Sequence, residues 1–196
     1  MRHKEGNKEK DIIEAAIKCF AKKGYHHSKI IDIAKIANVA VGSIYVYYNN
    51  KEDILIKIFN NLWERLYFKI TNIEKNSRLT PVEKIDTMIE DIFDAFIENP
   101  NLAIVFVNEQ QYLLKLSSTL SNNFHKKYLD VGEIFIKEGI QQNIFSSEIN
   151  SNIFRIFILG AIRNLLRYWA DTPVKISLAK IKENVTYLIR NGILKK

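Results

Sequence analysis

Apolar residues recur three and four positions apart along most of the chain, which is the spacing of amphipathic α-helices. The pattern predicts helices at residues 8–23, 29–37, 41–48, 51–73, 81–98, 102–116, 120–140, 152–170 and 178–191. Only three prolines and seven glycines accompany abundant Lys, Ile, Leu, Glu and Asn, a composition that favours helices over a β-sandwich. The sequence therefore predicts an all-α protein of about nine helices.

Residues with known preferences for helix ends stand where several of these helices should begin or end. Gly24 follows the first helix, Ser28 is expected to cap the second, and Asn38 suits a left-handed helix end. Asn50 is expected to cap the helix that begins at Lys51. Residues 80–83, Thr-Pro-Val-Glu, match a capping box with proline at the first helical position.

The second and third helices are short and separated by a tight bend, which predicts a helix-turn-helix. The apolar spacing turns Ile30, Ile33, Ala34 and Ala37 inward on the second helix, and Val41, Ile44 and Tyr48 inward on the third. It leaves Gly42, Ser43, Tyr45 and Tyr47 outside. A glycine and hydroxyl groups, where a solvated helix would carry Lys and Glu, favour close approach to a DNA groove. A small helix packed under another domain is the alternative.

The positive charge of the chain is concentrated at its N-terminal end. Residues 1–51 carry ten basic and five acidic side chains, so this segment contributes +5 of the net +7. A basic module is typical of proteins that bind nucleic acid, although a solvated basic face gives the same count. Lys51 stands in the first turn of a helix, where free backbone N–H groups can meet a phosphate.

The same stretch resembles the tetracycline-repressor (TetR) family of bacterial transcription regulators. The resemblance is carried by Gly24-Tyr25, Ile33-Ala34, Val39, and above all the run 41–48, VGSIYVYY, followed by 50–55, NKEDIL. In that family a G-x-(S/T/N)-(I/L)-Y-x-(Y/H)-(F/Y) pattern precedes a phosphate-contacting lysine. The chain departs from many members at Val41, where they carry a polar residue or Lys, so the resemblance does not support hydrogen-bonded base readout there.

The resemblance implies an N-terminal DNA-binding domain of three helices over residues 1–51 and a C-terminal effector-binding and dimerisation domain over residues 52–196. The DNA contacts are expected from Ser28, Lys29, Val41, Gly42, Ser43, Tyr45, Tyr47 and Lys51. The long helix that starts at Lys51 runs from the DNA side into the second domain, and we expect it to carry the effector's signal.

The C-terminal part holds more apolar and aromatic surface than a thin layer of helices needs, so it could enclose a ligand. The candidates for the pocket are Phe93, Phe96, Phe106, Glu109, Tyr112, Phe124, Tyr128, Arg163 and Arg167. Each aromatic residue could equally belong to the core. The segment 152–170 is apolar on nearly every side, and Leu178, Ile181, Val185 and Leu188 repeat at the spacing of a bundle seam. Burial of both helices within one chain and pairing with a second copy remain open, and the resemblance favours a homodimer.

Several function classes find no support in the sequence. No phosphate-binding glycine loop, metalloprotease motif or nucleophile elbow is present, and only Glu109 and Glu133 offer a pair of titratable groups for a helical enzyme. His26 and His27 lack a third metal ligand nearby. The single cysteine, Cys19, excludes a disulfide framework, and no segment has the length and apolarity of a signal peptide or membrane span. We therefore expect a cytoplasmic protein without cofactor or metal, with a protein-binding adaptor as a further alternative.

The combined expectation is a repressor that binds a palindromic operator as a homodimer and is released by a hydrophobic effector. Within the family the chain looks most like the branch that controls fatty-acid degradation, whose members respond to long-chain acyl-CoA. The phrases that suggest this branch are residues 24–26, 45–48, 50–56 and 101–105. By this resemblance Arg163 or Arg167 could meet a CoA phosphate. A multidrug-type regulator with a different effector is the alternative.

Overall fold

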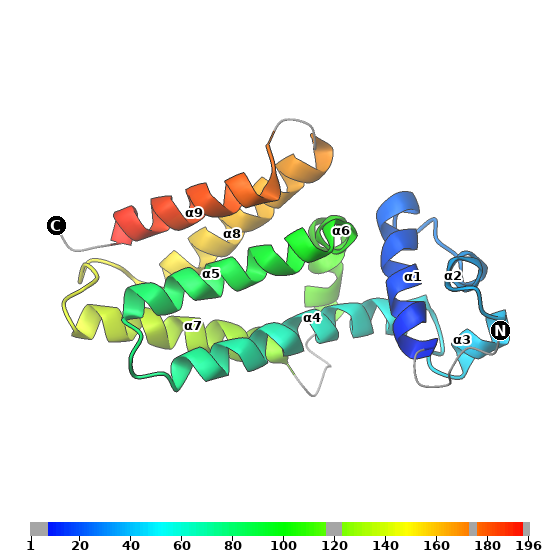
Figure 1. Cartoon of the computed structure of the whole chain (residues 1–196), viewed down its shortest axis with the longest axis horizontal. Coiled ribbons are helices and arrows are strands. Elements are labelled where there is room, and N and C mark those ends of the chain that lie inside the picture. The colour runs from blue at the N-terminus through cyan, green and yellow to red at the C-terminus, as the bar shows by residue number, and fades with distance from the viewer. Residues whose placement is uncertain (1–7, 117–122, 173–175, 194–196) are drawn as a thin grey trace. The chain divides into compact units, whose positions relative to one another are not determined.

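The computed structural model describes residues 8–116, 123–172 and 176–193, without the side chains of residues 110–116 and 193. Over these residues the chain forms nine α-helices and no strand (Figure 1). They are α1 (Lys8–Lys23), α2 (Ile30–Ala37), α3 (Val41–Tyr45), α4 (Lys51–Glu74), α5 (Pro81–Glu98), α6 (Pro100–Leu116), α7 (Phe124–Gln141), α8 (Ser151–Asp171) and α9 (Leu178–Ile193). The all-α prediction is confirmed.

The helices group into two compact units. The first unit contains residues 1–61 and 100–120, and the second contains residues 62–99 and 121–196. Helix α6 thus packs with the N-terminal helices, and α4 contributes residues to both units. The division at residue 51 between a DNA-binding and an effector domain stays a proposal about function, because the packing groups the helices differently.

The first unit is built around α1, which contacts both α2 and α6. Its core contains Ile12, Ala16 and Phe20 from α1, which are almost fully buried. The rings of Phe59 on α4 and Phe106 on α6 stack with their centroids 5.9 Å apart. Cys19 is buried on the apolar side of α1, as the sequence predicts.

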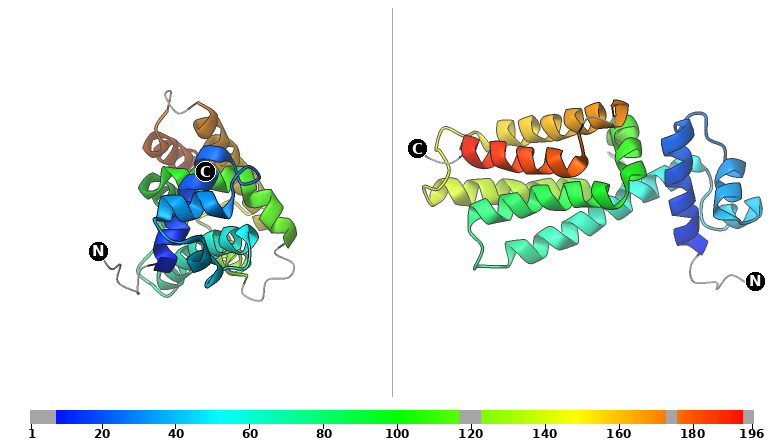
Figure 2. Two further views of the ribbon diagram at one scale, coloured as in Figure 1. Left: turned by 90° about the vertical axis from the view of Figure 1, so that its right-hand side faces the viewer. Right: turned by 45° about the horizontal axis from the view of Figure 1, so that its top comes forward.

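The second unit contains a ring of four helices in which α5 contacts α7 and α9, and α8 also contacts α7 and α9 (Figure 2). The C-terminal part of α4 adds an aromatic group beside α7. The rings of Trp63 and His125 lie 4.4 Å apart, and burial lowers the pKa of His125 to about 4, with the charge of Arg155 as the second cause. Ion pairs join α5 to α7 through Lys84 and Glu138 and to α9 through Lys182 and Asp94.

Most helix ends lie where the sequence places them. Gly24 has a φ of 77° after α1 and Asn38 has a φ of 55° after α2, so both occupy the left-handed region. Asn50 accepts from the backbone N–H of Asp53, and Thr80 and Glu83 form the predicted capping box. Helix α6 begins two residues before its predicted start, and α7 begins at Phe124, because the Asn123 side chain caps it by accepting from the backbone N–H of Lys126. Residues 120–122 of the predicted helix lie outside the described part of the chain.

Candidate functional site

The loop between α1 and α2 sets the position of the helix-turn-helix. The Ser28 hydroxyl donates to the carbonyl of Gly24 at 2.7 Å, and the Ser28 side chain is only 2% exposed. Lys29, not Ser28, is the N-cap residue of α2, so the prediction that Ser28 caps this helix is wrong. The Ser28 hydroxyl is buried and donates inside the unit, and its predicted contact with DNA stays a prediction.

Charged groups fix the start of α2. The backbone N–H of Lys29 donates to the Asp32 carboxylate at 3.1 Å, and Lys23 on α1 forms an ion pair with the same carboxylate at 2.7 Å. These contacts lower the pKa of Asp32, with the Lys23 hydrogen bond as the largest cause. The Lys29 side chain is exposed, so it can still reach a ligand.

Helix α3 is anchored by two side chains and ends earlier than predicted. Ile44 is fully buried and Tyr48 is almost fully buried, as the sequence predicts. The Tyr48 hydroxyl donates to the Glu9 carboxylate on α1 at 2.9 Å, and burial together with Glu9 raises the pKa of this phenol. The helix ends at Tyr45. The chain then forms a turn, where the sequence predicts helix to residue 48.

The outward surface of α3 and the turn after it is rich in large apolar and phenolic side chains. Tyr45 is 55% exposed, Tyr47 is 40% exposed and Val46 is 79% exposed. Val41 is 36% exposed, so the prediction that it faces inward is wrong, because it stands at the N-terminal end of a five-residue helix. Val46 was not among the predicted DNA contacts. Its position directly after Tyr45 could have indicated that it is exposed on the same surface.

Gly42 faces open space on this surface. A Cβ added there would meet no atom within 4 Å, and its φ lies outside the left-handed region. The fold of the chain therefore does not require glycine at this position, where alanine would favour a helix. A glycine on an exposed surface allows the backbone of another molecule to come close.

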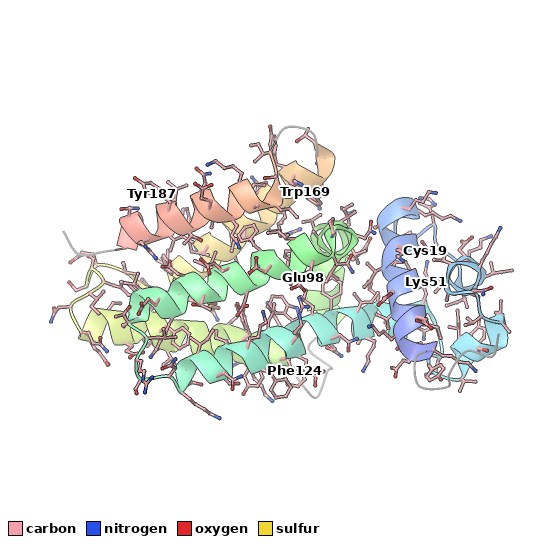
Figure 3. The ribbon with its side chains drawn as sticks, viewed as in Figure 1. Cys19, Lys51, Glu98, Phe124, Trp169 and Tyr187 are labelled. Atoms are coloured by element: carbon pink, nitrogen blue, oxygen red, sulfur yellow. The ribbon has the colours of Figure 1, made fainter. Side chains whose placement is uncertain are left out.

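Lys51 lies against the α1–α2 loop, and Figure 3 labels it there together with Cys19 of α1. Its ammonium group donates to the carbonyls of Tyr25 at 2.8 Å, His26 at 3.0 Å and Ser28 at 3.2 Å. The ammonium also lies 4.5 Å from the centroid of the Tyr25 ring. An ammonium has three donors, and these three carbonyls use them. The phosphate contact of Lys51 stays a prediction.

A cavity in the second unit lies between α5, α7 and α8. Its lining is mostly aliphatic and comprises Ile85, Met88, Ile89, Ile92, Leu129, Gly132, Glu133, Ile136, Ser151, Phe154, Arg155, Ile158, Leu159 and Ile162. The polar members gather on α7 and the first turns of α8, where the Ser151 hydroxyl donates to Glu133 at 3.3 Å. Lys137 pairs with Glu133 at 2.9 Å and is the main cause that lowers its pKa.

Met88 fills part of this cavity. A Cβ added at Gly132 would lie 2.6 Å from the terminal methyl of Met88, so this methionine occupies the room left by the missing side chain. The remaining free volume is about 50 Å³. Pockets for drug-sized ligands measure roughly 300–1,000 Å³, so a long ligand needs side chains to move aside.

None of the eight predicted pocket residues whose side chains are described lines this cavity. Phe93, Phe96 and Tyr128 are core residues, and the Tyr128 hydroxyl donates to the Met88 carbonyl at 2.9 Å. Phe124 contacts the rings of Tyr67 and Phe68. Phe106 and Glu109 are buried in the first unit, so Glu109 and Glu133 belong to different units.

The remaining pocket candidates are Tyr112, Arg163 and Arg167. The Tyr112 side chain lies outside the described residues. Arg167 is exposed on α8, and the buried Nε of Arg163 has no hydrogen-bond partner among the described residues. Their predicted contact with a CoA phosphate stays a prediction.

Helices α8 and α9 lie side by side (Figures 1 and 2). They leave large apolar side chains exposed. The exposed large apolar and aromatic side chains on α8 are Ile153, Ile156, Phe157 and Tyr168, and those on α9 are Tyr187 and Leu188. Tyr187 points away from the other helices in Figure 3. Leu178, Ile181 and Val185 are buried as the predicted seam, but Ile189 takes the place expected for Leu188, which is 67% exposed.

A groove of about 450 Å³ runs along this face. It is lined by Ile149, Phe154, Phe157, Ile158, Ala161, Leu165, Val185, Leu188, Ile189 and Gly192. Phe154 and Ile158 line both this groove and the cavity between α5, α7 and α8. These two side chains thus form a shared wall between the two spaces.

Two kinds of feature are absent from the residues that the structure describes. No group of three or more His, Cys, Asp or Glu side chains is arranged to hold a metal ion. No helix there combines the length and apolarity needed to cross a membrane.

Two protein-family models match the chain. Residues 12–58 match the bacterial regulatory proteins of the tetR family, and residues 59–192 match the C-terminal region of YsiA-like proteins. The fatty acid metabolism regulator protein of Bacillus subtilis is 34% identical over 188 residues, which cover 94% of this chain and 95% of that protein.

Solved structures of similar proteins have the same fold. The fatty acid degradation regulator FadR from Bacillus halodurans has a TM-score of 0.82 and 30% sequence identity, covering 96% of this chain and 97% of that chain. FadR from Bacillus subtilis, solved in complex with stearoyl-CoA, has a TM-score of 0.77 and 31% identity, covering 94% and 98%.

Proposed function

The chain belongs to the TetR family of bacterial transcription regulators and is a DNA-binding regulator rather than an enzyme, and from this premise we propose its partners. We propose a cytoplasmic homodimeric repressor that binds a two-fold symmetric operator and releases it on binding a long-chain acyl-CoA. The effector proposal is supported by the similarity to a FadR protein that was solved with stearoyl-CoA.

The observation that carries the DNA-binding part is the open outward surface of α3. Gly42 there leaves space that nothing in the folded chain uses, and Tyr45 and Tyr47 expose phenol groups beside it. Tyrosine hydroxyls are common donors to phosphate oxygens, and a small residue lets a helix approach a groove closely. Residues 1–51 also carry a net charge of +5, which favours a polyanionic partner.

The apolar face of α8 and α9 supports the homodimer. Phe157 and Leu188 line its groove with about two thirds of each side chain exposed, which is costly to leave in water over a continuous patch. Gly160 of α8 has open space where its side chain would be, so a second helix can approach it closely. The same two helices of a second copy would complete a four-helix interface.

The cavity between α5, α7 and α8 is the proposed site of the acyl chain. Its aliphatic lining suits a hydrocarbon, and Arg155 offers a positive charge to an anionic head group. The charge of Glu133 is paired with Lys137, which leaves little attraction for a cationic drug. Because α4 belongs to both units, it is the element through which we expect ligand binding to reach the helix-turn-helix.

A gel-shift titration tests this proposal. Purified protein is mixed with duplexes from the region upstream of its own gene, and palmitoyl-CoA, stearoyl-CoA, free CoA or a cationic dye is then added. We expect one two-fold symmetric duplex, with half-sites about 34 to 36 Å apart or a multiple of that distance, to bind and to be released only by the long-chain acyl-CoAs. Release by the dye alone would support the multidrug alternative instead.

A variant at Met88 locates the effector site. Met88→Ala removes the side chain that fills the cavity and should lower the acyl-CoA concentration for half-release severalfold, because less has to move aside. Met88→Leu keeps most of the volume and serves as the matched control. Equal release curves for the wild type and Met88→Ala would place the acyl chain elsewhere.

A further inference from the structure

The side chains that α3 offers to a duplex are unusual for a recognition helix. Between Ala40 and Tyr48, all of them described, the chain contains no Arg, Lys, Asn, Gln, Asp or Glu. Tyr48 is turned inward to Glu9, so Ser43, Tyr45 and Tyr47 are the residues left with a hydrogen-bonding side chain outside. The side chains that usually distinguish bases by paired hydrogen bonds are therefore missing from this helix and the turn after it.

Apolar groups take their place. Val46 is the most exposed large apolar side chain of the structure, and Val41 opens the same helix at its other end. Gly42 next to Val41 lets the helix backbone approach its partner, because no side chain stands out there. The surface thus combines the methyl groups of two valines with a glycine that lets the helix backbone approach a partner closely.

On the major-groove edge of a base pair, the C5-methyl group of thymine is the apolar feature that such side chains can recognise. We infer that α3 reads thymine methyl groups through Val41 and Val46, while its tyrosines hold phosphates and fix the register. This inference rests on the proposed entry of α3 into a major groove. It adds the identity of the groups that are read, namely thymines at fixed positions of each half-site.

Uracil substitution tests this inference directly. A duplex that binds the protein tightly is first selected from a random library, and each dT in its half-sites is then replaced by dU in separate duplexes. The replacement removes one methyl group and keeps base pairing and every hydrogen-bonding atom. We expect one or two positions per half-site at which dU weakens binding about fourfold, the effect of removing one buried methyl group.

Protein variants assign each sensitive position. Val46→Ala should bind the dT and dU duplexes equally at the position that Val46 contacts, while remaining sensitive at the other position. Ile31→Ala is the matched control, because Ile31 is also a largely exposed aliphatic residue but lies on α2. It should keep the full difference between dT and dU at both positions.

The outcomes separate the two proposals. If a duplex is selected but every dU duplex binds like its dT parent, the reading of methyl groups is wrong, while the operator proposal stands. If the Val41→Ala and Val46→Ala variants keep every dT preference, the valines do not read thymine. If no duplex is enriched over random DNA at moderate salt, sequence-specific binding fails and this inference fails with it.

Discussion

The surface of α3 and the face of α8 and α9 both leave large apolar side chains open, but they surround them with different groups. On α3 the exposed valines alternate with Ser43, Tyr45 and Tyr47, in a segment with a net charge of +5. On α8 the exposed residues Ile153, Ile156 and Phe157 follow one another at helical spacing, and the two phenols of the α8 and α9 face, Tyr168 and Tyr187, lie outside this run.

The difference indicates different partners. Phenols and hydroxyls beside a basic segment suit phosphates and base edges. An aliphatic stripe along a groove suits another helix. Exposed apolar area alone does not identify a partner, whereas the polar groups within it do.

The glycines of the two units sharpen this comparison. Gly42 and Gly160 stand on the two open surfaces, and a side chain at either position would meet nothing in the chain. Gly132 and Gly139 lie inside the second unit, where a Cβ would collide with Met88 and with the ring of Phe145. The packing of the chain thus explains the second pair but not the first, for which we propose partner molecules.

The largest effect is expected when a charge is placed on the α8 and α9 face. Phe157→Glu would bury an unpaired carboxylate in the dimer interface and should weaken dimerisation by roughly a thousandfold, in line with about 3–5 kcal/mol for such a charge. Sedimentation across a dilution series measures this change. Ile134→Glu on α7, at a similarly exposed aliphatic residue, is the control and should stay dimeric. An unchanged dimer in Phe157→Glu would rule out this face.

A bulky side chain on α3 should break DNA binding without harming the fold. Gly42→Leu would hold the helix away from the groove and should weaken operator binding by about a hundredfold or more, as for the loss of a central contact. Because the position faces open space, the melting temperature should stay equal or rise, and the protein should stay dimeric. Normal operator binding by Gly42→Leu would show that α3 is not the recognition helix.

The two units should also respond differently to pH. His125 has its pKa lowered from 6.5 to about 4 by burial, so it stays neutral in the folded protein while the unfolded chain takes up a proton. Its contribution to the free energy of unfolding is complete above pH 6.5 and is lost as pH falls towards 4, by up to roughly 3 kcal/mol.

Tryptophan fluorescence during urea unfolding measures this effect in the second unit, since both tryptophans, Trp63 and Trp169, belong to it. His125→Phe keeps an aromatic ring beside Trp63 and removes the titration, so its stability should fall less between pH 6.5 and 4. If the free energies of unfolding of the wild type and His125→Phe fall equally between pH 6.5 and 4, His125 does not titrate as inferred.

The smallest effect is expected at Lys51, at the edge of the α3 surface. Lys51→Met removes the ammonium donor from three loop carbonyls, of which that of Tyr25 keeps the backbone N–H of Ser28 as a donor, and should lower the free energy of unfolding by about 1 kcal/mol. Because the ammonium is directed into the loop, the slope of log affinity against log salt should change by less than about one. A slope lower by one with unchanged stability would instead support the phosphate contact that the family resemblance implies.

The helices and their ends could largely be predicted from the sequence, because apolar spacing and capping are local. Gly24, Asn38, Asn50 and the capping box at Thr80 all lie where local preferences place them. Ser28 has the same local preference but is drawn into the loop by the carbonyl of Gly24. A cap depends on where a hydroxyl points, and tertiary contacts decide this.

The outward direction of Tyr45 and Tyr47 could be predicted from the sequence, whereas the cavity could not. Tyr45 stands on α3 and Tyr47 in the turn after it, and the buried Ile44 marks the inner side, so the outward direction of both follows from spacing. The cavity depends on how α5, α7 and α8 meet, and on Met88 lying over Gly132. Phe93 and Phe96 resemble pocket residues by type, yet they are core residues, since hydrophobicity does not distinguish a filled interior from a hollow one.

The wall formed by Phe154 and Ile158 has a consequence for measured affinities. A hydrocarbon on one side of these side chains and a partner subunit on the other would press on the same two residues. By thermodynamic linkage, if the acyl ligand changes the monomer–dimer equilibrium, subunit association must change ligand affinity by the same factor. Effector dissociation constants for this protein should therefore drift with protein concentration across the range in which dimers form.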